Sequence, residues 1–191
     1  MSGNRKRSYA SRAGEKLAYA LKEFGLSPVN WVCADLGSST GGFVDCLLKN
    51  GAAKVYAVER GYGVIDYLVR SNPRVIVMER TDALHVHLPE PVHLVTIDTS
   101  WTRQCHILPI ARRLVMSQGH IVTLVKPHYE AAPELLNEGV LPDEHLQPVV
   151  QEIRSTLDHL GLGLAGETES PIRGHGGNRE WLWHLHHQET R

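Results

Sequence analysis

The sequence predicts an α/β fold in which a mostly parallel sheet is covered by helices on both faces. Short apolar runs alternate along the chain with segments whose apolar residues have helical spacing, and no internal repeat is visible. Strands that alternate with helices pair in parallel, because each helix carries the chain back across one face of the sheet. The 191 residues are 42% hydrophobic and 21% charged, which is enough for one buried core and excludes a disordered chain.

Seven short apolar runs predict the strands of this sheet. Most of them stop at a charged residue or at a turn, as buried strands do. They are residues 31–35, 54–59, 74–79, 93–98, 120–126, 162–168 and 179–187. The first five alternate with helices, whereas the last two follow one another and are expected to form a closing pair.

Five segments with helical spacing predict the helices. They are residues 11–25, 43–49, 64–70, 103–116 and 143–160. The first has the clearest signals, because Ser11 can cap it and Gly25 can end it. The pair Gln118-Gly119 is expected to end the fourth helix. Residues 127–142 begin at a proline and are expected to be irregular.

A glycine-rich turn over residues 35–42 (DLGSSTGG) follows the first strand. Its glycines would let the backbone approach a ligand closely. No lysine follows them, so the phosphate-loop pattern is absent, and the second glycine comes too late for a dinucleotide fingerprint. Asp35 opens the turn and Glu59 follows 24 residues later, where an acid can hold ribose hydroxyls. The two acids favour a nucleoside ligand with a cationic amino-acid end, such as S-adenosylmethionine, over a turn without a ligand.

Charged residues also stand where two later strands end. Asp98 ends the run at 93–98, and Lys126 ends the run at 120–126. Ligands of parallel sheets bind beyond the carboxyl ends of the strands. One charged residue at a strand end is usually a surface residue. Two opposite charges on adjacent strand ends, beside a glycine-rich turn, indicate a site.

Cysteine and histidine give weaker signals. The three cysteines form no CxxC pair, which argues against a disulfide framework and a structural zinc site and fits a reducing cytosol. His184 and His186 alternate in the last strand and are interpreted as strand-face residues, with metal binding as the alternative. No apolar run reaches the ~18 residues of a membrane-spanning helix. We therefore expect a cytoplasmic protein that uses no metal.

Basic residues are concentrated at the amino terminus. Residues 1–22 hold six basic side chains and one acidic one, while the remainder holds 14 basic and 20 acidic, so the net charge of −1 conceals a positive end. Such a block can contact RNA phosphates, and it can equally be a solvated terminus. The candidates for RNA contact are Arg5, Lys6, Arg7 and Arg12.

Eight motifs, taken together, resemble the FtsJ/TlyA family of ribosomal RNA 2′-O-methyltransferases, most closely its TlyA (haemolysin A-like) branch. They are SRAGEKL at 11–17, DLGSSTGGFVDCLL at 35–48, GAAKVYAVERGYG at 51–63, RVIVMERTDA at 74–83, IDTSW at 97–101, LVKPHYE at 124–130, EGVLPD at 138–143 and GNREWL at 177–182. The resemblance implies a Rossmann-like class I methyltransferase domain over residues 11–191, preceded by a basic arm of residues 1–10. Family members usually carry an amino-terminal S4 RNA-binding domain, which we expect this chain to lack.

The resemblance also implies roles for residues at matching motif positions. S-adenosylmethionine would be the cofactor, and its contacts would be Asp35, Gly37, Ser39, Gly41, Gly42, Phe43, Glu59, Asp82 and Asp98. The catalytic set around the reacting hydroxyl would be Lys16, Asp98, Lys126 and Glu180. Three positions depart from the family pattern and are expected to alter packing more than chemistry. They are Glu59 in place of aspartate, Trp101 in place of phenylalanine and His128-Tyr129 in place of Gln-Phe.

Such a catalytic set suits methylation of a ribose. A sugar hydroxyl is a weak nucleophile, so a base must take its proton while the oxygen attacks the methyl carbon. A lysine can be that base where a second cation favours its neutral form. Lys126 would be the base and Lys16 the second cation, although two coupled lysines leave the assignment open. Asp98 would orient Lys126, and Glu180 would hold Lys16 or the ribose.

We therefore expect an S-adenosylmethionine-dependent ribose 2′-O-methyltransferase that acts on ribosomal RNA or a ribosomal subunit and not at a membrane. One alternative is a methyltransferase of the same fold that acts on a small molecule. It is suggested by the missing S4 domain and by the slightly acidic chain that follows the basic terminus. Another is a non-catalytic RNA-binding or ribosome assembly factor. The intact catalytic set argues against this last alternative.

Overall fold

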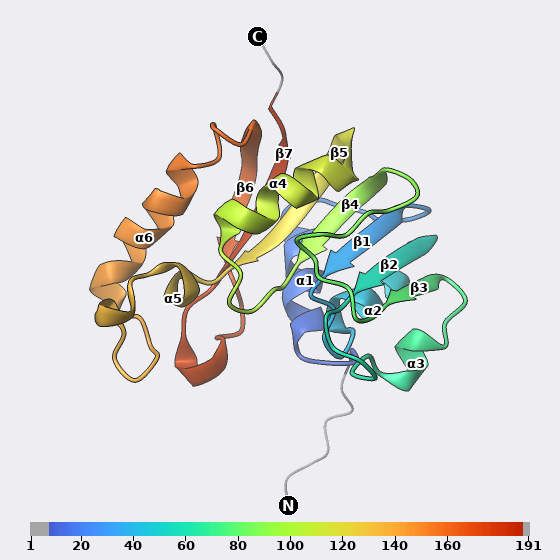
Figure 1. Cartoon of the computed structure of the whole chain (residues 1–191), viewed down its shortest axis with the longest axis horizontal. Helices are drawn as coiled ribbons and strands as arrows, with labels where there is room; N and C mark the ends of the chain where they lie inside the picture. The colour runs from blue at the N-terminus through green and yellow to red at the C-terminus, as the bar shows by residue number, and fades with distance from the viewer. Residues whose placement is uncertain (1–7, 189–191) are drawn as a thin grey trace, which may run out of the picture.

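Seven strands form one sheet in the order β3-β2-β1-β4-β5-β7-β6 in the computed structural model, which describes residues 8–188 (Figure 1). In chain order they are β1 (Val32–Leu36), β2 (Lys54–Val58), β3 (Val75–Met78), β4 (Val92–Ile97), β5 (Val115–Val125), β6 (Leu162–Glu169) and β7 (Trp181–His187). Neighbouring strands are parallel except where β7 runs antiparallel between β5 and β6. The predicted α/β fold with a mostly parallel seven-stranded sheet is confirmed.

The strand order reverses between β1 and β4. The chain lays β1, β2 and β3 side by side toward one edge, then returns to place β4 beside β1 and β5 beside β4. The connections that leave β1 and β4 diverge as a result. In parallel sheets such a reversal opens a crevice beyond the carboxyl ends of the two strands.

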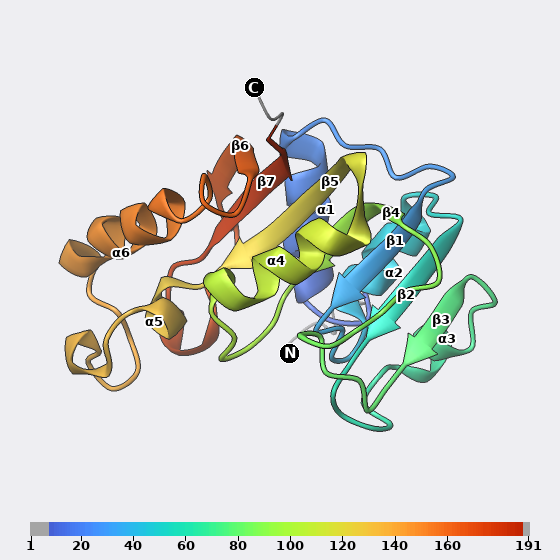
Figure 2. The same ribbon diagram turned by 45° about the horizontal axis from the view of Figure 1, so that its top comes forward.

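Helices cover both faces of this sheet (Figure 2). They are α1 (Ala13–Glu23), α2 (Gly42–Lys49), α3 (Tyr67–Arg70), α4 (Gln104–Leu114), α5 (Pro127–Glu130) and α6 (Asp143–Ser155), with the 3₁₀ turns η1 (Pro133–Leu135) and η2 (His175–Gly177). Leu17 of α1 and Leu47 of α2 are buried in one apolar cluster. Ile107 of α4 and Val149 of α6 belong to a second cluster on the opposite face. Because both faces are covered, the strands appear in the sequence as continuous apolar runs.

The start of α1 differs from the prediction. The helix spans 13–23 rather than 11–25, and Arg12 occupies the N-cap without a side-chain capping bond, so the predicted cap at Ser11 is wrong. The Ser11 hydroxyl lies instead against Gly42 at the start of α2, where an added Cβ would come within 2.2 Å of it. Gly25, with φ at +65°, follows the helix end as predicted.

Two other helices are shorter than predicted. α3 covers only the last four residues of 64–70, because the Asp66 carboxylate accepts a hydrogen bond from Leu68 N at 2.8 Å and fixes the helix start. α6 ends at Ser155 rather than 160, and the next residue, Thr156, donates its hydroxyl to Ile153 O at 2.7 Å. Such side-chain bonds to the backbone compete with helix continuation. No helix within residues 8–188 is long and apolar enough to cross a membrane.

β5 begins five residues earlier than predicted. It follows α4 directly at Val115, so the expected turn at Gln118-Gly119 is wrong. Gly119 lies inside the strand, where an added Cβ would come within 2.8 Å of the His93 carbonyl oxygen on β4. The β4–β5 register also shifts in this region. Glycine at position 119 allows the two strands to approach closely. The neighbouring sequence does not distinguish this role of a glycine from a role in a turn.

His184 on β7 packs against His120 on β5. The His120 Nδ1 and His184 Nε2 atoms are 3.0 Å apart, and the Trp31 ring stacks on His120 at 5.3 Å between centroids. Burial lowers the pKa of His184 to about 4, helped by the neighbouring His120 and His186, and burial also lowers the pKa of His120. As predicted, His184 lies on a strand face.

We predict that substitution of His184 reduces the acid sensitivity of the fold. Its pKa is about 4 in the folded chain and near the ordinary 6.5 in the unfolded chain. The unfolded chain therefore binds an extra proton between these values, and the free energy of unfolding falls as the pH falls through this window. In His184→Gln the slope of the free energy of unfolding against pH should be lower in this window, by an amount that corresponds to at most about one bound proton. Urea denaturation at several pH values measures it, and an unchanged pH dependence would contradict the prediction.

Candidate functional site

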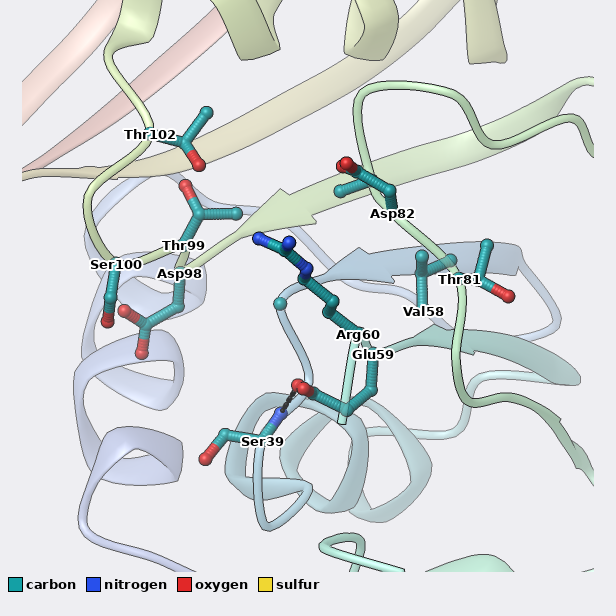
Figure 3. Close-up of a pocket in the computed structure, with 12 residues that line it drawn as sticks. Ser39, Val58, Glu59, Arg60, Thr81, Asp82, Asp98, Thr99, Ser100 and Thr102 are labelled. Carbon is teal, nitrogen blue, oxygen red and sulfur yellow. Dashed lines mark hydrogen bonds between the residues drawn. The ribbon is translucent and has the colours of Figure 1, made fainter. Parts of the chain in front are cut away.

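A cavity of about 290 Å³ opens beyond the carboxyl ends of β1, β2 and β4 (Figure 3). Its wall is made by the turns that follow these strands and by the segment after β3. The residues of the wall that the sequence predicted are Gly37, Ser39, Glu59, Asp82 and Asp98. The cavity therefore lies where the strand order reverses, as the fold requires.

The glycine-rich turn after β1 adopts a backbone that few residues allow. Gly37 and Gly41 have φ at +85° and +91°, and Ser39 between them has φ at +48°. A Cβ at Gly37 would come within 3.0 Å of the Asp98 carbonyl oxygen. Glycine at position 37 thus lets the turn pack directly against the end of β4.

Glu59 is fixed at the cavity wall by backbone amides. Ser39 N and Gly61 N donate to its two carboxylate oxygens, each at 2.7 Å, and Figure 3 shows the first of these bonds. A carboxylate can accept about four hydrogen bonds. Glu59 therefore keeps acceptor positions for further donors, such as the two hydroxyls of a ribose.

A smaller cavity of about 80 Å³ extends the site toward β1 and α2. It shares Gly37, Ser39 and Asp98 with the larger one. The further predicted residues that line it are Asp35, Gly42 and Phe43. Gly41 is the one predicted cofactor residue that lines neither cavity, because it occupies the N-cap of α2 and faces Val69.

Asp35 is fully buried in the centre of the sheet beside this smaller cavity. Its Oδ1 accepts a hydrogen bond from the Thr96 hydroxyl at 2.6 Å, while Oδ2 has no partner within the described residues. Burial raises the pKa of Asp35 to about 7, against the hydrogen bonds from Thr96 and Ser38. An unpartnered buried carboxylate oxygen is costly unless a donor or cation reaches it.

The predicted catalytic residues form two lysine–carboxylate pairs. Lys126 Nζ is 2.6 Å from Asp98 Oδ1 and donates to Thr99 O at 3.0 Å. Lys16 on α1 pairs with Glu180, and both side chains are more than nine-tenths buried. The pairs connect strand ends to elements far away in the sequence.

Two observations put these pairs in one region. Trp181 at the start of β7 pairs in register with Val125 at the end of β5, so Glu180 and Lys126 leave neighbouring strands at the same edge. The pKa of the buried His128 is lowered to about 4, first by burial and then by the positive charges of Lys126 and Lys16. Both lysines therefore lie close to His128.

An aromatic pair, of which Trp101 is exposed and Tyr129 is half-buried, lies beside Lys126. The sequence indicated these residues only as departures from a family pattern. Trp101 is 81% exposed and has φ at +63°, an unusual backbone for so large a side chain. Its ring lies 4.6 Å from the Tyr129 ring, and Lys126 Nζ lies 5.8 Å from that same Tyr129 ring. The pair offers a flat apolar surface next to the Asp98–Lys126 pair.

Sequence reasoning missed several residues of the larger cavity. They are Val58, Arg60, Thr81, Ala83, Thr99, Ser100 and Thr102. Each neighbours a predicted residue at a strand end or lies in the loop that follows, and that proximity is the only signal that could have found them. The predicted RNA contacts Arg5, Lys6 and Arg7 lie outside the described residues. Arg12 is exposed at the start of α1.

Comparison with known proteins identifies relatives over nearly the whole chain. Residues 9–187 match the FtsJ-like methyltransferase family. YqxC of Bacillus subtilis is 40% identical in an alignment of 187 positions that covers 93% of this chain and 66% of YqxC. TlyA of Mycobacterium tuberculosis, named a 16S/23S rRNA (cytidine-2′-O)-methyltransferase, is 36% identical over 191 residues, with 97% of this chain and 71% of TlyA covered. The chain thus spans about two thirds of the length of YqxC.

Solved structures agree with these relatives. A protein from Lactococcus lactis that is named a hemolysin superimposes with a TM-score of 0.90 and 37% identity over 94% of this chain and 89% of that one. A protein of the same name from Streptococcus thermophilus gives a TM-score of 0.93 and 33% identity over 98% of this chain and 70% of that one.

We predict that the ionisation of Asp35 weakens the ligand-free fold. Its pKa rises from 3.8 to about 7 on folding. Between these values the folded chain holds a proton that the unfolded chain has lost, so the free energy of unfolding falls as the pH rises through this window. Asp35→Asn cannot ionise and should lose this dependence, the opposite direction to that at His184. Urea denaturation of the ligand-free protein from pH 4 to 8 would measure it, and a variant with the parent's slope would disprove it.

Proposed function

We propose, since this chain belongs to the FtsJ-like methyltransferase family, that it transfers a methyl group from S-adenosylmethionine to a ribose 2′-hydroxyl of ribosomal RNA. The observation that carries this proposal is the presence of two lysine–carboxylate pairs, Lys16–Glu180 buried and Lys126–Asp98 partly buried, beside a cavity whose wall holds a fixed acid. A general base is what a ribose hydroxyl needs in order to attack. The name of the relative TlyA supports the same substrate.

The residues of the two cavities fit S-adenosylmethionine. Glu59, already oriented by two amides, would accept hydrogen bonds from the ribose hydroxyls of the cofactor. The unpartnered oxygen of Asp35 fits the cationic amino-acid end, because a cation removes the cost of burying it. When bound, S-adenosylmethionine supplies a methyl group on a positively charged sulfur that an oxygen nucleophile can attack.

Lys126 is the base in this proposal. Its Nζ accepts the 2′-hydroxyl proton while the oxygen attacks, which requires the neutral amine at that moment. Asp98 and the Thr99 carbonyl hold the Nζ in position, at 2.6 and 3.0 Å. Lys16 adds a second positively charged side chain to the same region. Glu180 holds Lys16 in turn.

Two features support RNA as the substrate. The exposed ring of Trp101, packed on Tyr129 beside Lys126, can stack on a nucleobase, which would bring the adjoining ribose toward Lys126. The basic residues Arg5, Lys6, Arg7 and Arg12 would contact phosphates. The partner that we propose is ribosomal RNA or a ribosomal subunit.

Mapping ribose methylation tests this function directly. Ribosomal RNA from cells with and without this chain would be analysed by mass spectrometry, and purified subunits from the deficient cells would be incubated with the protein and labelled cofactor. We expect one or more 2′-O-methylated nucleotides that disappear with the gene and return in vitro. Label that enters only small molecules would overturn the proposal in favour of a metabolite methyltransferase.

For the cofactor, we predict that Glu59→Ala weakens S-adenosylmethionine binding by ~1–3 kcal/mol, the range for hydrogen bonds to a charged acceptor. Glu59→Gln keeps the shape and one acceptor oxygen, so its loss should be smaller. Titration calorimetry without RNA measures both. A dissociation constant unchanged in Glu59→Ala would reject the ribose assignment.

For the chemistry, we predict that Lys126→Ala binds the cofactor normally but transfers methyl groups at least ~10²-fold more slowly, the lower range for a positioned acid–base group. Lys126→Arg should be nearly as slow, because a guanidinium stays protonated. The parent's rate should rise with pH, because only the neutral amine of Lys126 can accept the hydroxyl proton, and this rise should vanish in both variants.

A matched control is Lys54→Ala, which breaks the exposed ion pair between Lys54 and Glu90. Lys54 lies at the start of β2, at the end of the strand away from the cavity. This variant should leave the methyl transfer rate unchanged. High activity in Lys126→Arg would mean that the lysine acts only as a positive charge and that another group removes the proton.

A further inference from the structure

The EGVLPD segment at 138–143 has no part in the two cavities, yet it is tied to the loop that precedes β7. Asn178 in that loop is 4% exposed. Its Oδ1 accepts a hydrogen bond from Leu141 N at 3.0 Å, and its Nδ2 donates to Gly139 O at 2.9 Å and to His175 O at 3.1 Å. One side chain therefore joins two loops that are about forty residues apart in the sequence.

Further bonds close the loop between β6 and β7. Ser170 N donates to Glu180 O and Gly174 N donates to Asn178 O, each at 2.8 Å. Arg179 binds Glu169 through two hydrogen bonds, at 2.8 and 2.6 Å. The loop is thus held at its ends by its own backbone, and its middle is held by Asn178.

The middle of this loop lies directly on the Glu180 carboxylate. A Cβ added at Gly174 would come within 2.2 Å of Glu180 Oε1. Gly174 has φ at −70°, so it is the lack of space, and not the backbone conformation, that requires a glycine here. The loop backbone therefore covers Glu180, whose side chain is only 4% exposed.

A buried ion pair is stable only while its geometry is held and water is kept out. Lys16, at 7% side-chain exposure, depends on Glu180 for its one hydrogen bond within the described residues. Whatever holds the loop over Glu180 also holds Lys16.

We propose that Asn178 is the positioning residue of the Lys16–Glu180 pair: by joining segment 139–141 to the loop before β7, it presses Gly174 onto Glu180 and excludes water from both charges. This inference rests on the proposed function for the role of the pair in methyl transfer, although the closure itself does not. Asn178 lines neither cavity, so it should not affect cofactor binding.

Chemical labelling of Lys16 tests the closure without reference to activity. Acetylation by acetic anhydride would be followed by mass spectrometry, with the exposed Lys22 on the same helix as internal standard. In Asn178→Ala the loop should open, and the relative labelling rate of Lys16 should rise about tenfold or more. The methyl transfer rate should fall about 10²-fold, as for a misplaced catalytic group, while the dissociation constant of S-adenosylmethionine stays the same.

Two further variants make the test specific. Gly174→Ala keeps the Asn178 bonds but displaces Glu180, so it should slow methyl transfer to a similar extent. Asn50→Ala removes an exposed asparagine whose Nδ2 donates to Cys46 O at the far end of α2, and it should match the parent in labelling and rate. Asn178→Asp keeps the acceptor for Leu141 N and loses both donors, so it should fall between parent and Asn178→Ala.

The outcomes separate the two proposals. Unchanged labelling of Lys16 in Asn178→Ala overturns the closure, and increased labelling with an unchanged transfer rate overturns the positioning role. If Asn178→Ala does not fold, the same readouts in Asn178→Asp decide. If the parent transfers no methyl group to any RNA, the proposed function fails, while the labelling still decides whether Asn178 closes the loop.

Discussion

The parallel pairing of β1 with β4 is the constraint on which the site depends. The strand order reverses at this pair, so the chain that leaves β1 and the chain that leaves β4 diverge and leave space between them. The Thr96 hydroxyl bonds Asp35 across the two strands at 2.6 Å, and Gly37 lets the turn after β1 pack against the end of β4. A side chain at position 37 would push these segments apart and change the shape of both cavities.

The two lysine–carboxylate pairs use this framework in different ways. Asp98 and Lys126 follow neighbouring parallel strands, so the register of β4 and β5 is enough to bring them together. Lys16 and Glu180 are 164 residues apart and meet only because β7 is antiparallel. The antiparallel direction of β7 puts its first residue at the edge of the sheet where the parallel strands end, and Glu180 comes just before that residue. Burial then makes the second pair dependent on its surroundings, since charges taken from water need a fixed partner.

The sequence predicted the elements whose signals are local. All seven strands were found. Most of them are unbroken apolar runs, as a sheet covered on both faces needs, and the acids at strand ends stand out against these runs. Two of the errors occurred where one residue type serves two purposes. Gly119 resembles a turn but lies within β5 to avoid the His93 carbonyl, and Ser11 resembles a helix cap but packs on Gly42. In both places a contact with a distant segment outweighs the local preference.

The sequence by itself determined the order of strands and helices, the glycine-rich turn and the identity of the charged residues at the strand ends, because these depend on neighbours along the chain. Through its resemblance to a known family, it also indicated which residues form the catalytic set and the cofactor contacts. Only the tertiary structure decided that Lys16 meets Glu180, that Trp101 lies on Tyr129 and that Asn178 ties two loops over the buried pair. The reason is physical: each of these contacts joins segments whose separation in the sequence carries no information about their distance in space. That distance is set by how the helices pack on the sheet and by where the antiparallel strand enters it.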